Sequence, residues 1–212
     1  MRVSELSRVT GVPVATIKYY LREGLLPSGE LSPPNRARYG DAHAHRVALI
    51  RSLTDVGGMS IADVRTVLQV IDTPGIPIHD VLGATVQAIT AARPGAGTGG
   101  EQRDAARMVD DLIARRGWQV HRTNPSRAIA EDVLARLDRL GQQRVIEALD
   151  AYAAAADLIA EADLAVVAAV EGRDARAETA VLGTLLGDVL IAALRRLAQE
   201  HISAKQFPPP TE

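Results

Sequence analysis

The sequence predicts a mainly α-helical chain with one small β hairpin, and three observations lead to this prediction. Over most of the 212 residues, apolar positions recur three and four apart, which is the spacing of one helix face. A segment near the N-terminus, residues 24–39, is too rich in Pro, Gly, Ser and Asn for a helix. Beyond residue 103, only short glycine and proline turns interrupt the helical pattern. We therefore expect a small N-terminal domain and an all-helical C-terminal half.

The first 23 residues read as two short helices joined by a glycine turn. Residues 3–9 form the first, Gly11 makes the turn, and residues 13–23 form the second, with Val14, Ile17 and Leu21 on its buried face. A helix, a glycine turn and a second helix make up the helix-turn-helix pattern, whose second helix enters the major groove of DNA.

The opposite face of the second helix has the composition of a DNA-contacting surface. Ala15, Lys18, Tyr19 and Arg22 lie at i, i+3, i+4 and i+7 and share this face, and we add Thr16 to the expected contacts. The alanine permits close approach to DNA. The cations can neutralise phosphates or donate to guanine, and the tyrosine can bond to phosphate. The alternative is an ordinary solvated helix face.

The segment that follows predicts a basic wing. Gly24 ends the helix, and SGELSPPNRARY then carries two arginines and a tyrosine at its end. Arg36 and Arg38 are two apart, so in an extended strand both side chains point to the same side. We expect a short hairpin that places Arg36, Arg38 and Tyr39 beside the second helix, which completes a winged helix-turn-helix.

Three stretches together resemble the winged helix-turn-helix domain of the MerR family of bacterial transcription regulators: MRVSELSRVTGVPVATIKYYLREGLLP, NRARY and ALIRSLTDVGGMSIADVRTVL. The resemblance covers about residues 1–70, with departures at Pro13, Ala15, Lys18 and Leu21 that leave the exact base contacts open. It implies a homodimer on a near-palindromic promoter operator in double-stranded DNA, which it distorts so that RNA polymerase can engage. It also implies that a small-molecule effector often binds the C-terminal domain.

Charge and composition agree with this division of the chain. The net charge is −2, but residues 1–51 hold eight Lys/Arg against four Asp/Glu, a balance of +4. Residues 72–212 hold fifteen against twenty, a balance of −5. The positive field therefore coincides with the proposed DNA-binding domain. There is no cysteine, which excludes disulfides and thiolate metal sensing. No signal peptide or membrane-spanning run is evident, so we expect a soluble cytoplasmic protein with no membrane partner.

We expect the DNA-binding domain to span residues 1–71 and to be followed, over residues 72–93, by a hinge and a dimerisation helix. The helix follows DTPGIP and carries a narrow apolar seam of the kind that pairs two helices. The resemblance implies dimerisation at this place, and the alternative is a helix that packs within its own chain. The expected dimerisation residues are Ile78, Val81, Leu82, Thr85 and Ile89.

The remaining chain divides into a glycine-rich linker at 94–102, an all-helical domain at 103–205 and a disordered tail at 206–212. The last helix, over residues 176–202, is apolar almost all round. It is therefore expected in the middle of a bundle or at a subunit interface.

Two groups of residues in this half are candidates for an effector pocket. Trp118 and His121 offer a stacking surface and a titratable group, and Asp157 and Glu161 lie on an alanine-rich helix. Asp188 interrupts the most apolar helix, where a buried carboxylate needs a partner. The alternatives are that Asp188 forms an ion pair within the bundle and that Trp118 is a core residue.

The motifs expected of an enzyme are missing from the sequence. We find no Ser/His/Asp arrangement, no phosphate-binding glycine loop and no histidines with metal-ligand spacing, so we expect neither catalysis nor a cofactor. The sequence therefore predicts a dimeric, sequence-specific transcription regulator. The alternatives are an architectural or recombination accessory protein without an effector, and a helical half that binds a protein partner.

Overall fold

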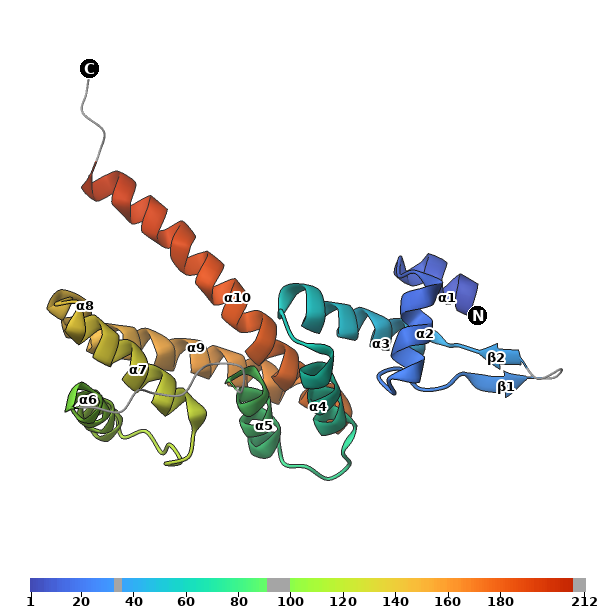
Figure 1. Cartoon of the computed structure of the whole chain (residues 1–212), viewed down its shortest axis with the longest axis horizontal. Helices are drawn as coiled ribbons and strands as arrows, with labels where there is room; N and C mark the ends of the chain where they lie inside the picture. Colours follow the sequence, from blue (N-terminus) through green and yellow to red (C-terminus); the bar gives the residue numbers. More distant parts are fainter. Residues whose placement is uncertain (33–35, 91–99, 208–212) are drawn as a thin grey trace, which may run out of the picture. The chain divides into compact units, whose positions relative to one another are not determined.

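The computed structural model describes residues 1–32, 36–90 and 100–207, and it confirms the mainly α-helical fold (Figure 1). The chain groups into two compact units, Met1–Thr73 with Leu182–Glu212, and Pro74–Val181.

The N-terminal unit contains two short helices, a hairpin and two further helices. Its elements are α1 (Val3–Thr10), α2 (Val14–Arg22), β1 (Glu30–Ser32), β2 (Arg36–Arg38), α3 (Asp41–Arg51), the π-helical turn η1 (Ser52–Val56) and α4 (Ile61–Asp72). The single described sheet pairs β1 with β2 in antiparallel fashion. The helix-turn-helix, the wing and the two following helices thus occur in the predicted order.

A compact apolar core holds this unit together. α1 contributes Leu6 and α2 contributes Ile17, and both side chains are fully buried. Leu25 and Leu26, which follow the turn after α2, are buried as well. The core therefore holds the chain both before this turn, through Ile17, and after it, where the chain leads to the hairpin. Burying a leucine or isoleucine side chain contributes about 1.5–3 kcal/mol. The buried face of α2 therefore sets which of its residues remain in water.

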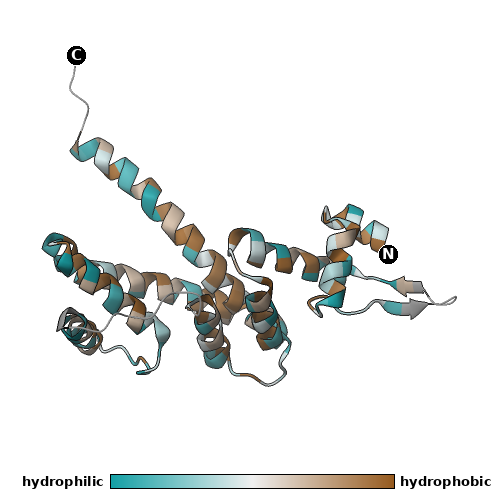
Figure 2. Cartoon of the chain, viewed as in Figure 1, coloured by the Kyte–Doolittle hydropathy of each residue, from teal (hydrophilic) through white to brown (hydrophobic). Residues whose placement is uncertain are grey.

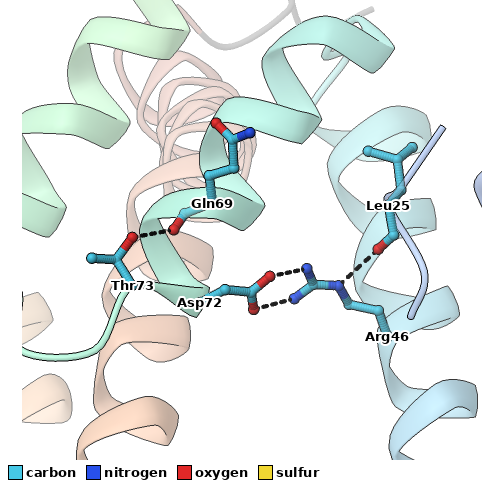
Figure 3. A network of polar contacts seen from close by, with 5 residues as sticks. All are labelled: Leu25, Arg46, Gln69, Asp72 and Thr73. Carbon is cyan, nitrogen blue, oxygen red and sulfur yellow. Dashed lines mark hydrogen bonds and ion pairs between the residues drawn. The ribbon is translucent and has the colours of Figure 1, made fainter. Parts of the chain in front are cut away.

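Two arginines of the N-terminal unit, Arg46 and Arg65, form internal bonds. Arg46 Nε donates to the Leu25 carbonyl at 3.0 Å, and its two terminal nitrogens bond the Asp72 carboxylate at 2.9 and 2.5 Å (Figure 3). The Arg46 side chain is only 14 % exposed. Arg65 similarly bonds the carboxylate and the carbonyl oxygen of Glu23. These side chains join α3 and α4 to the end of α2.

Replacement of Arg46 by Met is expected to lower the free energy of unfolding by about 1–3 kcal/mol, because the Leu25 carbonyl loses a charged donor and Asp72 loses its partner. Most of this loss comes from the carbonyl bond, since Asp72 is largely exposed and its ion pair is screened by solvent. Urea unfolding followed by circular dichroism measures the change. Arg8→Met removes an exposed arginine of α1 and is the control. Equal stability of the two variants would contradict the role given to Arg46.

The second unit is all-helical. Its elements are α5 (Ile78–Thr90), α6 (Gly100–Arg116), α7 (Pro125–Arg139), α8 (Gln143–Glu147), α9 (Leu149–Ala169) and the first part of α10 (Arg173–Gln206). α6 packs along α7, and Ala105, Val109, Leu134 and Ala135 form the buried cluster between them. Asn124 caps α7 by accepting the Ser126 N–H at 2.9 Å, as expected for an Asn-Pro helix start.

The expected linker and tail fall mainly on residues that the structure does not describe. Residues 91–99 and 208–212 lie outside the described part, whereas α6 already begins at Gly100 and α10 includes Gln206.

The last helix, α10, is 34 residues long, and its C-terminal half is exposed in the single chain. Of the two predicted places, the middle of a bundle within the chain is therefore wrong for this half, and a subunit interface stays a prediction. Apolar residues recur along it among hydrophilic ones (Figure 2). Length and hydropathy alone would also allow this helix to cross a membrane, a property that core helices of soluble proteins share. The exposed apolar residues of α10 are Val189, Leu190, Leu194, Leu197 and Ile202.

Candidate nucleic-acid interface

The second helix, α2, presents the predicted stripe of polar residues on the face opposite to its core residues. Gly11 adopts a φ of 70° in the turn before it, a left-handed conformation that glycine accepts without strain. Ile17 and Tyr20 point into the core, and burial raises the pKa of the Tyr20 hydroxyl. On the other face, Ala15, Lys18 and Arg22 are exposed, and Thr16 and Tyr19 are partly exposed.

Aromatic and ionic contacts organise the C-terminal end of this stripe. The Arg22 guanidinium carbon lies 5.3 Å from the centroid of the Tyr19 ring, a cation–π distance, while the Arg22 side chain stays 71 % exposed. The neighbouring Glu23 is bonded by Arg65 at 2.8 Å. Because Arg65 offsets the Glu23 charge, this carboxylate repels an approaching phosphate less. The end of α2 therefore keeps a positive character.

The hairpin forms the predicted wing. β1 and β2 pair with Glu30 opposite Arg38 and Ser32 opposite Arg36, and the Arg38 side chain is exposed. The tip, residues 33–35, and the Arg36 side chain lie outside the described part of the structure. Among the residues that the structure describes, no ion pair or side-chain hydrogen bond engages Lys18 or Arg38. Both cations are thus left to bind something else.

Tyr39 has a different role from the one expected. Its side chain is only 8 % exposed, and its ring packs edge-on against His43, with 5.2 Å between the centroids. Its backbone N–H donates to the Met1 carbonyl at 2.8 Å, and the Met1 amino group donates to the Tyr39 carbonyl at 2.7 Å. Tyr39 therefore anchors the base of the wing, and we withdraw it from the DNA-contacting set.

Gly29 makes the wing possible, because an added Cβ would lie 2.6 Å from the backbone oxygen of Arg38. Gly29→Ala is therefore expected to displace β2 and to weaken DNA binding about tenfold, equivalent to about 1.4 kcal/mol. Fluorescence anisotropy with labelled duplex DNA measures the affinity. Gly40→Ala, on the other side of β2, is the control, because a Cβ there meets nothing within 4 Å. If the Gly29→Ala variant binds DNA as tightly as the Gly40→Ala variant, the wing does not depend on the close approach of Gly29 to the Arg38 backbone.

Local sequence patterns did not reveal the internal bonds of Arg46 and Arg65. Their partners lie 26 and 42 residues away in the chain, beyond the reach of helical spacing. The balance of +4 over residues 1–51 therefore includes Arg46, paired with Asp72, and Arg51, paired with Asp55, although both carboxylates lie outside that range.

The expected dimerisation residues lie on α5, as predicted, but two of them are buried within their own chain. Val81 and Thr85 are 0 % and 1 % exposed, and the Thr85 hydroxyl donates to the Val81 carbonyl at 2.7 Å. Ile78, Leu82 and Ile89 are partly buried. α5 packs against α7, so the alternative of a helix packed within its own chain has structural support for this face.

The residues expected at an effector pocket do not gather into one cluster. Trp118 Nε1 donates to Asp157 Oδ1 at 2.6 Å, and the Arg116 guanidinium lies 3.6 Å from the same carboxylate. His121 contacts Thr123, and Glu161 is exposed on α9.

Asp188 lies on the part of α10 that groups with the N-terminal unit, and it is exposed in the single chain, so it is not buried in a bundle within its own chain. Among the described residues, no cluster of three or more His, Cys, Asp or Glu side chains is placed to hold a metal ion.

The fold and this interface define a winged helix-turn-helix DNA-binding protein. The family described as "MerR HTH family regulatory protein" matches residues 1–70. The crystal structure of SCO5550 from Streptomyces coelicolor A3(2), described as a candidate transcriptional regulator, has 31 % sequence identity and a TM-score of 0.75, with 100 % of each chain covered. The comparison with curated proteins gives no match. The chain belongs to the MerR family, and it is a DNA-binding transcription regulator.

Proposed function

We propose that this protein acts as a homodimer on a near-palindromic promoter operator and distorts the duplex there, under the control of a small molecule bound to its helical C-terminal half. The main support is that Lys18 and Arg38 are exposed on α2 and β2 with no ion-pair partner among the described residues, while Arg46 and Arg65 are paired internally. Exposed cations on a groove-sized helix and an adjacent strand suit phosphate and base-edge contacts.

A dimer follows from the small size of the reading element. One helix-turn-helix contacts few base pairs, so two copies on a symmetric site supply the affinity that a regulator needs. Because Val81 and Thr85 are buried within their own chain, we place the main contact between copies on the exposed apolar face of α10. Leu190, Leu194 and Leu197 lie on one side of that helix at spacings of three and four.

A second copy explains this face better than a membrane does. The exposed apolar residues extend to Ile202, beyond Arg195 and Arg196. Each arginine at the centre of a bilayer would cost about 2.5–3.5 kcal/mol, whereas a helix pair keeps charged residues at its solvated flanks. We therefore propose a cytoplasmic protein in which α10 packs against α10 of another copy.

Distortion of the operator is physically accessible to such a dimer. Bending or kinking a short duplex costs about 1–6 kcal/mol, which contacts from two copies can supply. An effector that binds one conformation more tightly shifts the balance between two DNA shapes by its difference in affinity. In this scheme RNA polymerase is the partner that responds to the change in promoter shape.

Footprinting on the intergenic DNA next to the protein's own gene tests the proposal. The expected result is a protected near-palindrome with two half-sites about one helical turn or a multiple apart. Uniform weak protection along the fragment, with no preferred site, would contradict a sequence-specific regulator.

A further inference from the structure

The second unit contains a cavity of about 280 Å³ between α6, α7, the connecting loop and the start of α9. Val109, Leu112 and Leu134 line it and are at most 7 % exposed. Trp118 from the loop and Leu149 from α9 line it as well. The lining of the cavity is therefore mainly apolar, and part of it, Val109 and Leu134, also belongs to the core cluster between α6 and α7.

We propose that this cavity binds a neutral, mainly apolar small molecule of about two fused or linked rings, and that this molecule is the effector. The inference rests on the proposed function, which requires a ligand in this half of the chain. A cavity of about 150 Å³ lined by aliphatic and aromatic residues holds one benzene ring, so a cavity of nearly twice that volume suits a ligand of two rings. Apolar pockets with a few polar groups are the usual form of small-molecule sites.

The polar groups at the cavity determine the charge of the ligand. Arg127 lines the cavity, but its side chain is only 14 % exposed and its guanidinium is paired with Asp110. Asn124 uses its side-chain oxygen to cap α7, and the Trp118 indole N–H donates to Asp157 at 2.6 Å. These bonds neutralise the charge of Arg127 and engage the Asn124 side-chain oxygen and the Trp118 N–H, so the lining polar groups not engaged by them, such as the Ser126 hydroxyl, carry no charge. A ligand carboxylate or ammonium would have no counter-charge here, so its burial would be unfavourable.

The single tryptophan of the chain, Trp118, makes the inference directly measurable. The probe is 6-propionyl-2-(dimethylamino)naphthalene, a neutral molecule of two fused rings whose emission shifts to shorter wavelength in apolar sites and which accepts energy from tryptophan. Titration into the full-length protein is expected to quench Trp118 emission saturably, with one probe per chain.

Two variants test whether the probe binds in the cavity. Ala130→Phe fills the cavity from an exposed position on α7, and we expect it to weaken probe binding at least tenfold. Leu164→Ser removes exposed apolar surface from α9 outside the cavity lining and is expected to leave the quenching of Trp118 unchanged. Far-UV circular dichroism verifies that each variant is folded. Ser126→Leu, at another exposed lining position, repeats the test if Ala130→Phe is misfolded.

The outcomes separate this inference from the proposed function, because binding to intergenic DNA is measured on the same samples without probe. Probe fluorescence without quenching of Trp118, or equal quenching in the filled variant, would overturn the assignment of the cavity. If the protein binds DNA specifically but does not bind the probe, the proposed regulatory function is retained and the proposed ligand site is wrong. If the wild-type protein does not bind DNA specifically, this result would instead contradict the proposed function.

Discussion

Simultaneous replacement of Lys18 and Arg38 by Ala is expected to abolish specific protection of operator DNA while the chain stays folded. Both side chains are exposed, and neither has an ion-pair partner among the described residues, so their removal disturbs no internal bond. Each direct contact to a base edge or phosphate contributes about 1–3 kcal/mol, so the two together predict a loss of about 30-fold to 10⁴-fold in affinity.

Fluorescence anisotropy at several salt concentrations measures this loss, and footprinting locates it. Loss of two phosphate contacts would also reduce the slope of log K against log salt by about two. A double variant of Arg103 and Arg144 to Ala removes the same charge from exposed positions of the second unit and is the matched control. An unchanged footprint for the folded Lys18 and Arg38 variant would show that DNA is read elsewhere on the protein.

Replacement of Leu190 and Leu194 by Asp is expected to convert the proposed dimer into a folded monomer of 22.6 kDa. The two leucines are 58 % and 49 % exposed in the single chain, so the substitutions leave its core intact. In a paired α10 they would place carboxylates inside an apolar contact, which costs several kcal/mol per buried charge. Operator affinity should then fall by about 10²–10⁴, because each half-site is bound independently.

Analytical ultracentrifugation measures the mass of this variant, and anisotropy measures its DNA affinity. Leu158 and Leu164 of α9 are exposed to a similar extent, 69 % and 51 %, so their replacement by Asp is the matched control. If the α9 variant becomes monomeric and the α10 variant stays dimeric, the contact between copies lies on α9, and the assignment to α10 is wrong.

The second helix, α2, shows what can be predicted from the sequence pattern of a single helix. Helical geometry alone puts Ile17 and Leu21 on one face of α2 and Lys18 and Arg22 on another face. The exposed stripe is therefore predictable from the sequence. Gly29 was not singled out, because the contact that requires it is with Arg38, which only hairpin pairing brings near. Tyr39 was misread for a similar reason, since its neighbours Met1 and His43 belong to other elements.

The sequence by itself determined the order of helices and wing, the charge of the DNA-binding domain and the identity of the exposed residues on α2, because these depend on neighbours within a few positions. Only the tertiary structure decided which cations stay available and which apolar faces stay uncovered. Arg46 is bound to Asp72 and α5 is covered by α7, whereas the C-terminal half of α10 keeps its leucines exposed. The reason is physical: a side chain's partner is chosen by packing between segments far apart in the chain, and periodicity within one segment carries no information about that choice.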